Sequence, residues 1–293
     1  MKRFILAYNP LSGDGRFKYR LDHVIERFQR AGCLVIPYRI QERNQNQRIV
    51  ELAQELAIDG IVVSGGDGTV HEIVNLVVAN KMNVPLGILP SGTSNDFAVY
   101  LQLGRSIEAW VSVVVAGKTR LVDVGKVNDR YFFNVASAGL LSSVAHSADI
   151  GLKNTLGKMA YYLKGLGELP NFRSLPLRIT ADGMSSEEDV LLFLVTNSST
   201  VAGFPSLAPH AKIDDGLLDM IAVRRCSLPE LMTLFLHFLK GSHHSSKHLI
   251  YLQAKDLQIT CQETVESDLD GERGPELPLK ITTIPAAIQV FCP

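Results

Sequence analysis

The chain contains 293 residues, of which 46% are hydrophobic and 20% are charged. This composition is typical of a folded globular protein and excludes a largely disordered chain, and the length predicts about two domains. The formal net charge of −1 excludes a strongly basic surface, so nucleic acid is not an expected partner. The longest near-apolar runs, 109–116 and 190–195, are far shorter than the ~20 residues that span a bilayer.

The cysteines show neither metal-ligand nor redox spacing, and the first nine residues read as a strand without a signal-peptide cleavage pattern. The cysteines are Cys33, Cys226, Cys261 and Cys292. We therefore expect reduced, mostly buried thiols in a cytoplasmic protein.

Residues 1–124 alternate between strand and helix patterns. Short apolar runs typical of strands lie at 4–8, 34–40, 61–63 and 86–89. Segments with apolar residues at helical spacing lie between them, at 21–31, 49–56 and 70–77. Such alternation predicts an α/β domain, in which helices cover both faces of a parallel sheet.

Residues 125–285 follow a different pattern. Most of their apolar stretches are short, strand-like and separated by turn residues, which predicts an antiparallel sandwich or barrel. Segment 153–169 interrupts this pattern and is predicted to be a moderately amphipathic helix. Segment 228–239 is apolar nearly all round, which predicts a helix buried between layers, with a membrane-touching helix as the alternative.

Glycine-rich loops follow three predicted strands of the first domain, at 9–15, 64–69 and 90–97. Ligands of an open α/β sheet bind beyond the carboxyl ends of its strands, so we expect these loops to meet at one edge. The first loop could hold a phosphate in a nest of backbone N–H groups, or be a surface turn. The third could bind phosphate through Thr93, or cap the next helix.

The second loop, Ser64-Gly65-Gly66-Asp67-Gly68-Thr69, carries the strongest signal. Its glycines allow the backbone to approach a ligand, and a helix that begins near its end adds N–H groups and a positive dipole end. Both features favour phosphate. A carboxylate repels phosphate, so Asp67 indicates Mg²⁺ handling or removal of a hydroxyl proton, with a helix N-cap as the alternative.

Acidic residues gather at two places in the second half of the chain. Asp215-Gly216 precedes a predicted strand, and Asp270-Gly271-Glu272 lies near the C-terminus. Residues two apart in an extended segment share a face, so Asp270 and Glu272 could reach one site. Each cluster could equally be an acidic turn.

Taken in order, these segments resemble the soluble diacylglycerol kinase and sphingosine kinase family of lipid kinases, particularly its bacterial members. The resemblance runs along essentially the whole chain. It is carried by Asn9-Pro10 with Ser12-Gly13; Gly65-Gly66-Asp67-Gly68-Thr69 with His71-Glu72 and Asn75; Pro90 with Gly92-Thr93 and Asn95-Asp96-Phe97; Ala208-Pro209 and Ala211 with Asp215-Gly216; and Asp270-Gly271-Glu272. The ordered set is much more specific than the second segment alone, which NAD kinases share.

The resemblance implies two domains. Residues 1–124, with a return strand near 286–293, would form a nucleotide-binding α/β domain like those of phosphofructokinase and NAD kinase. Residues 125–285 would form a β-sandwich-like lipid domain. The residues implied to bind ATP are Asn9, Pro10, Leu11, Ser12, Gly13, Gln41, Gly66, Asp67, Gly68, Thr69, Val70, His71, Glu72 and Thr93. Gln41 stands where family members normally carry threonine.

The resemblance also implies two magnesium sites. A structural Mg²⁺ would be held by the Asp215 carboxylate and the carbonyls of Lys212 and Leu217, since Mg²⁺ prefers hard oxygen ligands. An active-site Mg²⁺ would be held through water by the acids Asp67, Asp96 and Asp123. The proton acceptor maps to Glu272, with Asp270 and Asp67 as the other candidates.

The expected function is an ATP- and Mg²⁺-dependent lipid kinase of phospholipid biosynthesis. It would phosphorylate the hydroxyl of a diacylglycerol-like lipid to give phosphatidic acid and ADP. The alternatives are another lipid acceptor, such as a sphingoid base or phosphatidylglycerol, a soluble acceptor such as NAD, and a non-catalytic lipid-binding protein of the same fold.

The expected partners are ATP and a lipid at the membrane surface. The protein would lie in the cytoplasm, peripheral at the inner membrane face, and a homodimer is left open. An apolar groove for the lipid is expected near residues 140–169. Arg16, Lys18 and Arg20 could contact anionic lipid or form a solvated basic face.

Overall fold

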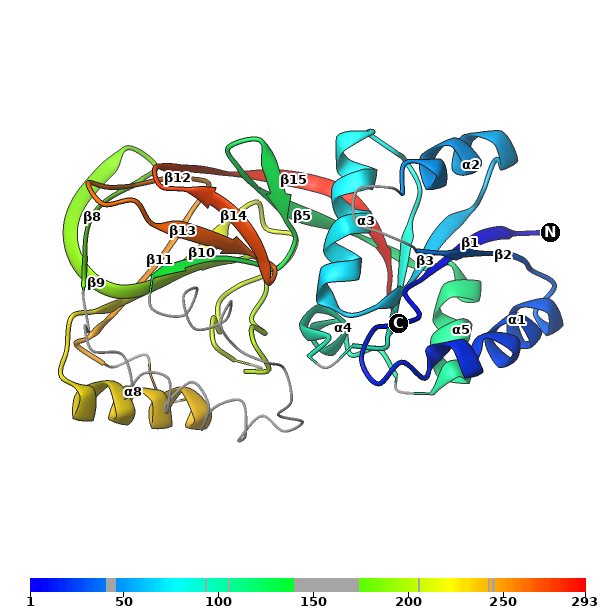
Figure 1. The fold of residues 1–293 in the computed structure, drawn as a ribbon, viewed down its shortest axis with the longest axis horizontal. Helices are drawn as coiled ribbons and strands as arrows, with labels where there is room; N and C mark the ends of the chain where they lie inside the picture. The colour runs from blue at the N-terminus through cyan, green and yellow to red at the C-terminus, as the bar shows by residue number, and fades with distance from the viewer. Residues whose placement is uncertain are drawn as a thin grey trace. The chain divides into compact units, whose positions relative to one another are not determined.

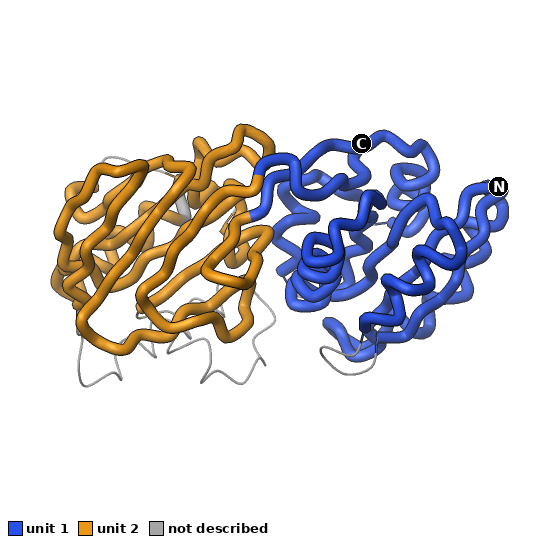
Figure 2. The backbone as a smooth tube through the Cα atoms, turned by 90° about the horizontal axis from the view of Figure 1, so that it is seen from above, with its two compact units in different colours: residues 1–124, 285–293 blue, residues 125–284 orange. Residues whose placement is uncertain are grey.

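The computed structural model describes residues 1–40, 46–92, 94–104, 106–139, 174–204, 206–241, 243 and 246–293. The chain divides into two compact units (Figure 2). Unit 1 contains residues 1–124 and 285–293, and unit 2 contains residues 125–284. The predicted helix at 153–169 and the lipid groove expected near 140–169 lie outside the described residues.

Unit 1 is built on a parallel sheet with the strand order β15-β4-β3-β1-β2. Its strands are β1 (Arg3–Tyr8), β2 (Leu34–Arg39), β3 (Gly60–Gly65), β4 (Leu86–Pro90) and the end of β15 (Leu279–Phe291). The central strands β1 and β3 are almost entirely buried. Their continuous apolar runs fit this position, because a parallel sheet is covered on both faces.

Helices cover both faces of this sheet (Figure 1). They are α1 (Leu21–Arg30), α2 (Arg48–Leu56), α3 (Asp67–Ala79), α4 (Asp96–Tyr100) and α5 (Ile107–Ala116). One face of the sheet carries an aromatic core. In this core, Phe28 packs against Phe4 and, edge to face, against Trp110. A short 3₁₀ helix, Phe17–Tyr19, precedes α1.

Unit 2 is an antiparallel β structure with the strand order β14-β13-β7-β9-β8-β12-β15, and β10 pairs with both β9 and β11. Its strands are β6 (Arg130–Phe132), β7 (Val135–Gly139), β8 (Leu175–Ala181), β9 (Met184–Thr196), β10 (Leu218–Arg224), β11 (Leu249–Ala254), β12 (Asp256–Cys261), β13 (Glu266–Leu269) and β14 (Glu272–Glu276). Two further strands, β5 (Thr119–Val127) and β15, begin in one unit and end in the other.

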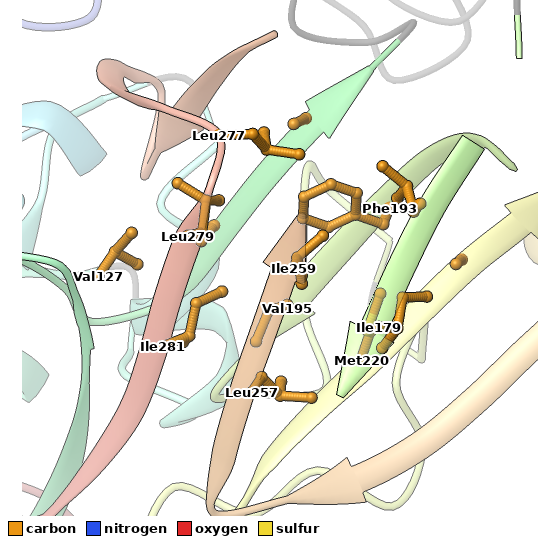
Figure 3. Packing of buried hydrophobic residues seen from close by; sticks show 14 of the residues in the cluster. Val127, Ile179, Phe193, Val195, Met220, Leu257, Ile259, Leu277, Leu279 and Ile281 are labelled. Atoms are coloured by element: carbon orange, nitrogen blue, oxygen red, sulfur yellow. The ribbon is translucent and has the colours of Figure 1, made fainter. Parts of the chain in front are cut away.

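The core of unit 2 lies between its strands. Leu257 and Ile259 on β12 and Leu279 and Ile281 on β15 alternate with exposed residues, as the period-two pattern requires. Figure 3 shows these side chains in one cluster with Phe193, Val195 and Met220. The fold class predicted from the sequence, an α/β domain followed by a β-sandwich-like domain, is confirmed.

The helix predicted at 228–239 is present as α8 (Leu228–Lys240), but its expected full burial is wrong. Leu231 and Leu234 are buried in a second core of unit 2, whereas Leu228 is 43% exposed and Leu236 is 52% exposed. A helix that packs on one side can bury only the stripe facing its neighbours. Within the described part of the chain, no helix combines the length and the apolar character needed to cross a membrane.

Candidate functional site

The three glycine-rich loops predicted from the sequence meet in unit 1. They follow β1, β3 and β4, which are adjacent parallel strands, so their carboxyl ends share one edge of the sheet. The backbone N–H of Asn9 donates to the Ser64 carbonyl at 2.9 Å, and that of Ser91 donates to the Gly65 carbonyl at 3.2 Å. The middle loop is thus hydrogen-bonded to both of its neighbours.

Thr69 links the first loop to the start of α3. Its Oγ1 accepts a hydrogen bond from Asn9 Nδ2 at 3.2 Å and lies 3.4 Å from Ser12 Oγ. The Ser12 hydroxyl in turn accepts the backbone N–H of Gly66 at 3.3 Å. These bonds fix the first loop over the N-terminus of the helix, where backbone N–H groups and the helix dipole favour anions.

Backbone atoms of the loops approach so closely that side chains would not fit. Gly13 has φ +61°, a left-handed conformation, and a Cβ there would overlap the Ser91 carbonyl oxygen. A Cβ on Gly92 would overlap the Cα of Gly66. The glycines therefore allow three turns to form one continuous backbone surface, which is the geometry that cradles phosphate in nucleotide-binding proteins.

The Asp67 carboxylate joins the second loop to the third. Its Oδ2 accepts the backbone N–H of Asn95, and its Oδ1 accepts that of Asp96, each at 3.0 Å. Asn95 has φ +51°, an unusual conformation for a residue with a side chain. Both oxygens of Asp67 thus hold a strained turn in place, which the sequence-based alternatives of metal ligand, base and helix N-cap did not include.

The other residues predicted on α3 contact protein groups. Asn75 Nδ2 lies 3.2 Å from His71 Nε2 and donates to the His71 carbonyl at 2.9 Å. Glu72 Oε1 accepts a hydrogen bond of 2.6 Å from Asn46 Nδ2. Val70 is buried in the core, so its side chain is not available to a ligand.

In the first loop, Pro10 is buried and Leu11 is 83% exposed. Gly68 is partly exposed. The predicted contacts of Gln41 and Thr93 lie outside the described residues.

The acids predicted to hold an active-site metal occupy two different environments. Asp96 is buried at the start of α4, beside Asp67. Asp123 is buried on β5, and its Oδ1 accepts the backbone N–H of Ala286 at 2.8 Å. Within the described residues, no group of three His, Cys, Asp or Glu side chains forms a direct metal-binding cluster. Carboxylate oxygens that already accept N–H groups retain lone pairs, which suits contact with a cation through water.

In unit 2, the acidic motif near the C-terminus is the tip of a β-hairpin. Leu269 of β13 pairs with Glu272 of β14, which leaves Asp270 and Gly271 as the connecting residues. Their φ angles are +53° and +89°, as in the two-residue type I′ turns that favour Asp-Gly and Asn-Gly. The N–H of Gly271 donates to Asp268 Oδ1 at 2.8 Å and further fixes the tip. Glu272, which is half-buried, follows directly.

The Asp270 carboxylate binds a row of backbone N–H groups from a distant part of the chain. Oδ2 accepts the N–H of Phe133 at 2.9 Å, and Oδ1 accepts those of Asn134 and Val135 at 3.0 and 2.8 Å. Asp270 is itself buried. The geometry makes this acid an anchor of the hairpin tip, while Glu272 begins the next strand.

The predicted structural metal site is a turn before β10. Asp215 Oδ1 accepts the N–H of Leu217 at 3.1 Å across Gly216, and Lys212 is exposed on the same segment. Carboxylate and carbonyl oxygens are donors of the kind that Mg²⁺ prefers.

Sequence reasoning missed Asp219, which is buried on β10 and accepts hydrogen bonds from the Tyr251 hydroxyl and from Gln253 Nε2. Burial raises the pKa of Asp219, and the two hydrogen bonds oppose this shift. Burial also raises the pKa of Tyr251. The sequence did contain a signal for Asp219, which is a carboxylate within the apolar pattern of a strand. Such an acid is expected to be buried and therefore to need hydrogen-bond partners.

Comparison with known protein families agrees with the two-part architecture. Residues 3–127 match the family model described as the diacylglycerol kinase catalytic domain. Residues 134–292 match the model described as the YegS C-terminal NAD kinase beta sandwich-like domain.

Individual proteins are similar over the whole chain. The diacylglycerol kinase of Bacillus subtilis (strain 168) is 34% identical over 294 residues, covering 100% of this chain and 97% of the relative. That of Staphylococcus aureus (strain bovine RF122 / ET3-1) is 35% identical over 293 residues, covering 100% and 93%. The crystal structure of a diacylglycerol kinase from Bacillus anthracis str. Sterne has a TM-score of 0.82 and 26% identity, covering 100% of this chain and 97% of that one.

The fold and the site together define a protein with a cluster of three glycine-rich loops on an α/β unit and a β-sandwich-like second unit. With full-length relatives above 30% identity, the chain belongs to the diacylglycerol kinase family. The resemblance seen in the sequence is confirmed, and the expected enzyme class, a phosphotransferase, is the class of this family.

Proposed function

We propose that this protein transfers the γ-phosphoryl group of ATP to the hydroxyl of diacylglycerol, giving phosphatidic acid and ADP. The observation that carries the proposal is the convergence of three glycine-rich loops at one sheet edge, in a chain whose full-length relatives are named diacylglycerol kinases. Phosphoryl transfer depends mainly on positioning and charge neutralisation, and a rigid backbone cradle supplies the first of these.

We assign ATP to unit 1 and the lipid to unit 2. The ATP phosphates would bind the backbone of Asn9–Gly13 and Gly66–Glu72, together with Thr93 and Gln41. The assignment is supported by the bonds that fix these loops through Thr69 and Ser12. Pre-formed N–H groups bind a polyanion without a further cost of ordering the loop.

Mg²⁺ is the metal that the family implies. When bound, it neutralises the charge that develops on the phosphoryl oxygens. Asp67 and Asp96 are adjacent and carry oxygen donors, so they would hold the ion through water, with Asp123 as a further acid. The turn containing Asp215, with the carbonyls of Lys212 and Leu217, would hold a structural ion.

We propose Glu272 as the group that takes the proton of the lipid hydroxyl. Of the three candidates, Asp67 and Asp270 each use both carboxylate oxygens to accept backbone N–H groups. Those acids are better suited to holding the backbone than to moving a proton. Glu272 directly follows a turn that Asp270 anchors, so its position on the hairpin is well defined.

A diacylglycerol substrate requires contact with a membrane surface. Exposed basic residues that could meet an anionic surface are Arg16, Lys18 and Arg20, beside the exposed Tyr19. A peripheral cytoplasmic enzyme of phospholipid biosynthesis, alone or as a homodimer, fits this function. If these basic residues form only a solvated face, they should make no contribution to the binding of vesicles.

An acceptor panel tests the proposed function. The protein is incubated with radiolabelled ATP and Mg²⁺, and with mixed micelles of diacylglycerol, sphingosine or phosphatidylglycerol, or with NAD. We expect label in phosphatidic acid. Label only in another lipid or in NAD would identify that compound as the acceptor. The absence of any labelled product would support a non-catalytic lipid-binding role. The variant Gly13→Val, in which a side chain overlaps Ser91, serves as the matched inactive control.

A further inference from the structure

A short segment of unit 2, residues 133–135, is held from two sides. On one side, Asp270 accepts its three backbone N–H groups, and the N–H of Asp270 donates to the Val135 carbonyl at 2.8 Å. On the other side lies the segment 196–200, at the end of β9. Asn134 is in the middle of the held segment and contacts both sides.

Asn134 uses its backbone and its side chain to bind the 196–200 segment. Its carbonyl accepts Thr196 Oγ1 at 3.0 Å and the N–H of Asn197 at 2.9 Å. Its Oδ1 accepts the Ser198 hydroxyl at 2.5 Å, and its Nδ2 donates to the Thr200 carbonyl at 3.1 Å. Both polar atoms of the side chain are therefore bonded within the same loop.

This polar network is buried. Asn134 is 5% exposed, and Thr196, Asn197, Ser198 and Thr200 are each at most 3% exposed. Polar groups buried away from water must be hydrogen-bonded, so few other arrangements of these residues are available. The network therefore selects one conformation of 133–135, and Asp270 transmits that conformation to the hairpin tip.

The hairpin tip carries the proposed proton acceptor. Glu272 lies two residues after Asp270, and the intervening Gly271 has φ +89° in a tight turn. The conformation of this turn consequently determines the direction in which the Glu272 side chain leaves the hairpin. A misplacement of about 1 Å in a catalytic group can lower a rate by roughly 10²-fold.

We propose that Asn134 is a positioning residue for the phosphoryl transfer, with Ser198 as its partner, acting through Asp270 on Glu272. The inference rests on the proposed function and adds residues that none of the sequence motifs contains. Asn134 does not touch the reacting atoms in this proposal; it sets the place from which Glu272 works.

The test compares Asn134→Ala and Ser198→Ala with Thr283→Val in the full-length protein. Thr283 is a matched control, because it is a buried hydroxyl of unit 2 that donates to the Lys255 carbonyl at 3.2 Å, a group outside the network. Tm is measured first, and turnover in diacylglycerol micelles and KM for ATP are then measured well below the lowest Tm. We expect kcat to fall roughly ten- to hundredfold in the two network variants, with KM for ATP within about twofold.

The control separates positioning from general destabilisation. Thr283→Val should lower Tm and keep the wild-type kcat, whereas a merely structural network would lower Tm in all three variants and leave kcat per folded molecule unchanged. Asn134 and Ser198 share one hydrogen bond, so the double variant should lose less kcat than the product of the two single losses.

A second variant keeps the test decisive if Asn134→Ala does not fold. Asn134→Asp retains the oxygen that accepts from Ser198 and removes the donor to Thr200. Wild-type turnover in this folded variant and in Ser198→Ala would overturn the inference while leaving the proposed function intact. A wild-type protein that labels no lipid would instead overturn the proposed function, and the inference with it.

Discussion

Oδ1 of Asp67 accepts the backbone N–H of Asp96 at 3.0 Å, so an acid from the N-terminus of α3 fixes the start of α4. Oδ2 makes the same bond to Asn95. The carboxylate thereby ties two of the loops that form the proposed phosphate cradle.

Asp67→Ala should weaken both the fold and ATP binding. Two partly buried N–H groups lose their acceptor, and leaving a buried donor unsatisfied costs about 1–3 kcal/mol. We expect a lower midpoint in urea unfolding and a fall of at least about tenfold in kcat/KM for ATP, since about 1.4 kcal/mol corresponds to tenfold.

Asp59→Ala is the matched control for this prediction. Asp59 also accepts a backbone N–H, that of Arg3 at 2.7 Å, but it lies at the amino end of β3. The Asp59→Ala protein should unfold at a lower urea concentration than the wild type, without a selective loss of ATP affinity. An Asp67→Ala protein with wild-type stability and wild-type KM for ATP would contradict the linking role.

Glu272→Gln should lower turnover and leave the fold intact. A positioned general base contributes roughly 10²–10⁴-fold, so kcat is expected to fall by about that factor. KM for ATP should stay near the wild-type value, because the proposed ATP contacts belong to other residues. Steady-state kinetics with diacylglycerol micelles measure both, and Glu276→Gln, at the other end of β14, is the control.

Asp270→Asn, in contrast to Glu272→Gln, should lower the stability of the fold. Its new amide would place N–H groups against the N–H groups of the 133–135 segment, so reduced stability should accompany any loss of turnover. If Glu272→Gln retains full activity, the proton acceptor has to be sought among the other acids.

The sequence contained enough information to predict the strands and the meeting of the loops. The apolar run in β3 and the glycines of 64–69 are local signals, and adjacent parallel strands must bring their following loops to one edge. The roles of Asp67 and Asp270 could not be read in this way. Asp270 and Val135 are 135 positions apart, so their bond depends on the assembled sheet.

The α8 helix illustrates a second limit. Its sequence is apolar on nearly every side, so periodicity alone does not choose the face that packs. Only the tertiary structure decides that Leu234 is buried and Leu236 is exposed. Likewise, Asn134 and Ser198 are ordinary polar residues in sequence, and their burial becomes visible only when β9 ends beside residues 133–135.

Magnesium should stabilise the protein through the turn at Asp215. A ligand that binds only the folded state raises stability by RT ln(1 + [L]/Kd), which is about 2.7 kcal/mol at a concentration of 100 Kd. We expect MgCl₂ to raise Tm in the wild type, and Asp215→Ala to lose the part of that rise that comes from this turn. Calorimetric scans with and without EDTA measure it directly.

The neighbouring acid supplies the control for the metal. Asp214→Ala removes a similar charge from the same turn, so a general ionic effect would change Tm equally in both variants. An Asp215→Ala protein that keeps the full rise in Tm would rule out a metal site at this turn. KCl at equal ionic strength excludes screening as the cause.

Stability should depend on pH through the N-terminus of α8. Glu230 forms a capping box with Ser227: its Oε2 accepts the backbone N–H of Ser227 at 2.9 Å and the hydroxyl at 2.8 Å. These bonds, the backbone one first, hold the pKa of Glu230 below its ordinary value of 4.5. A carboxyl whose pKa is lowered by folding stabilises the protein above its unfolded pKa and loses that contribution as pH falls through the folded value.

Glu230→Gln should therefore have a lower Tm than the wild type at pH 7, and the difference should shrink as pH falls from about 4.5. Calorimetric scans between pH 7 and pH 3 measure this change. Glu187→Gln is the control, because Glu187 is a well exposed acid paired with the exposed Arg178, and surface pairs contribute little. A Tm difference for Glu230→Gln that is the same at both ends of the range would mean that the charge of the capping carboxylate adds nothing beyond its shape.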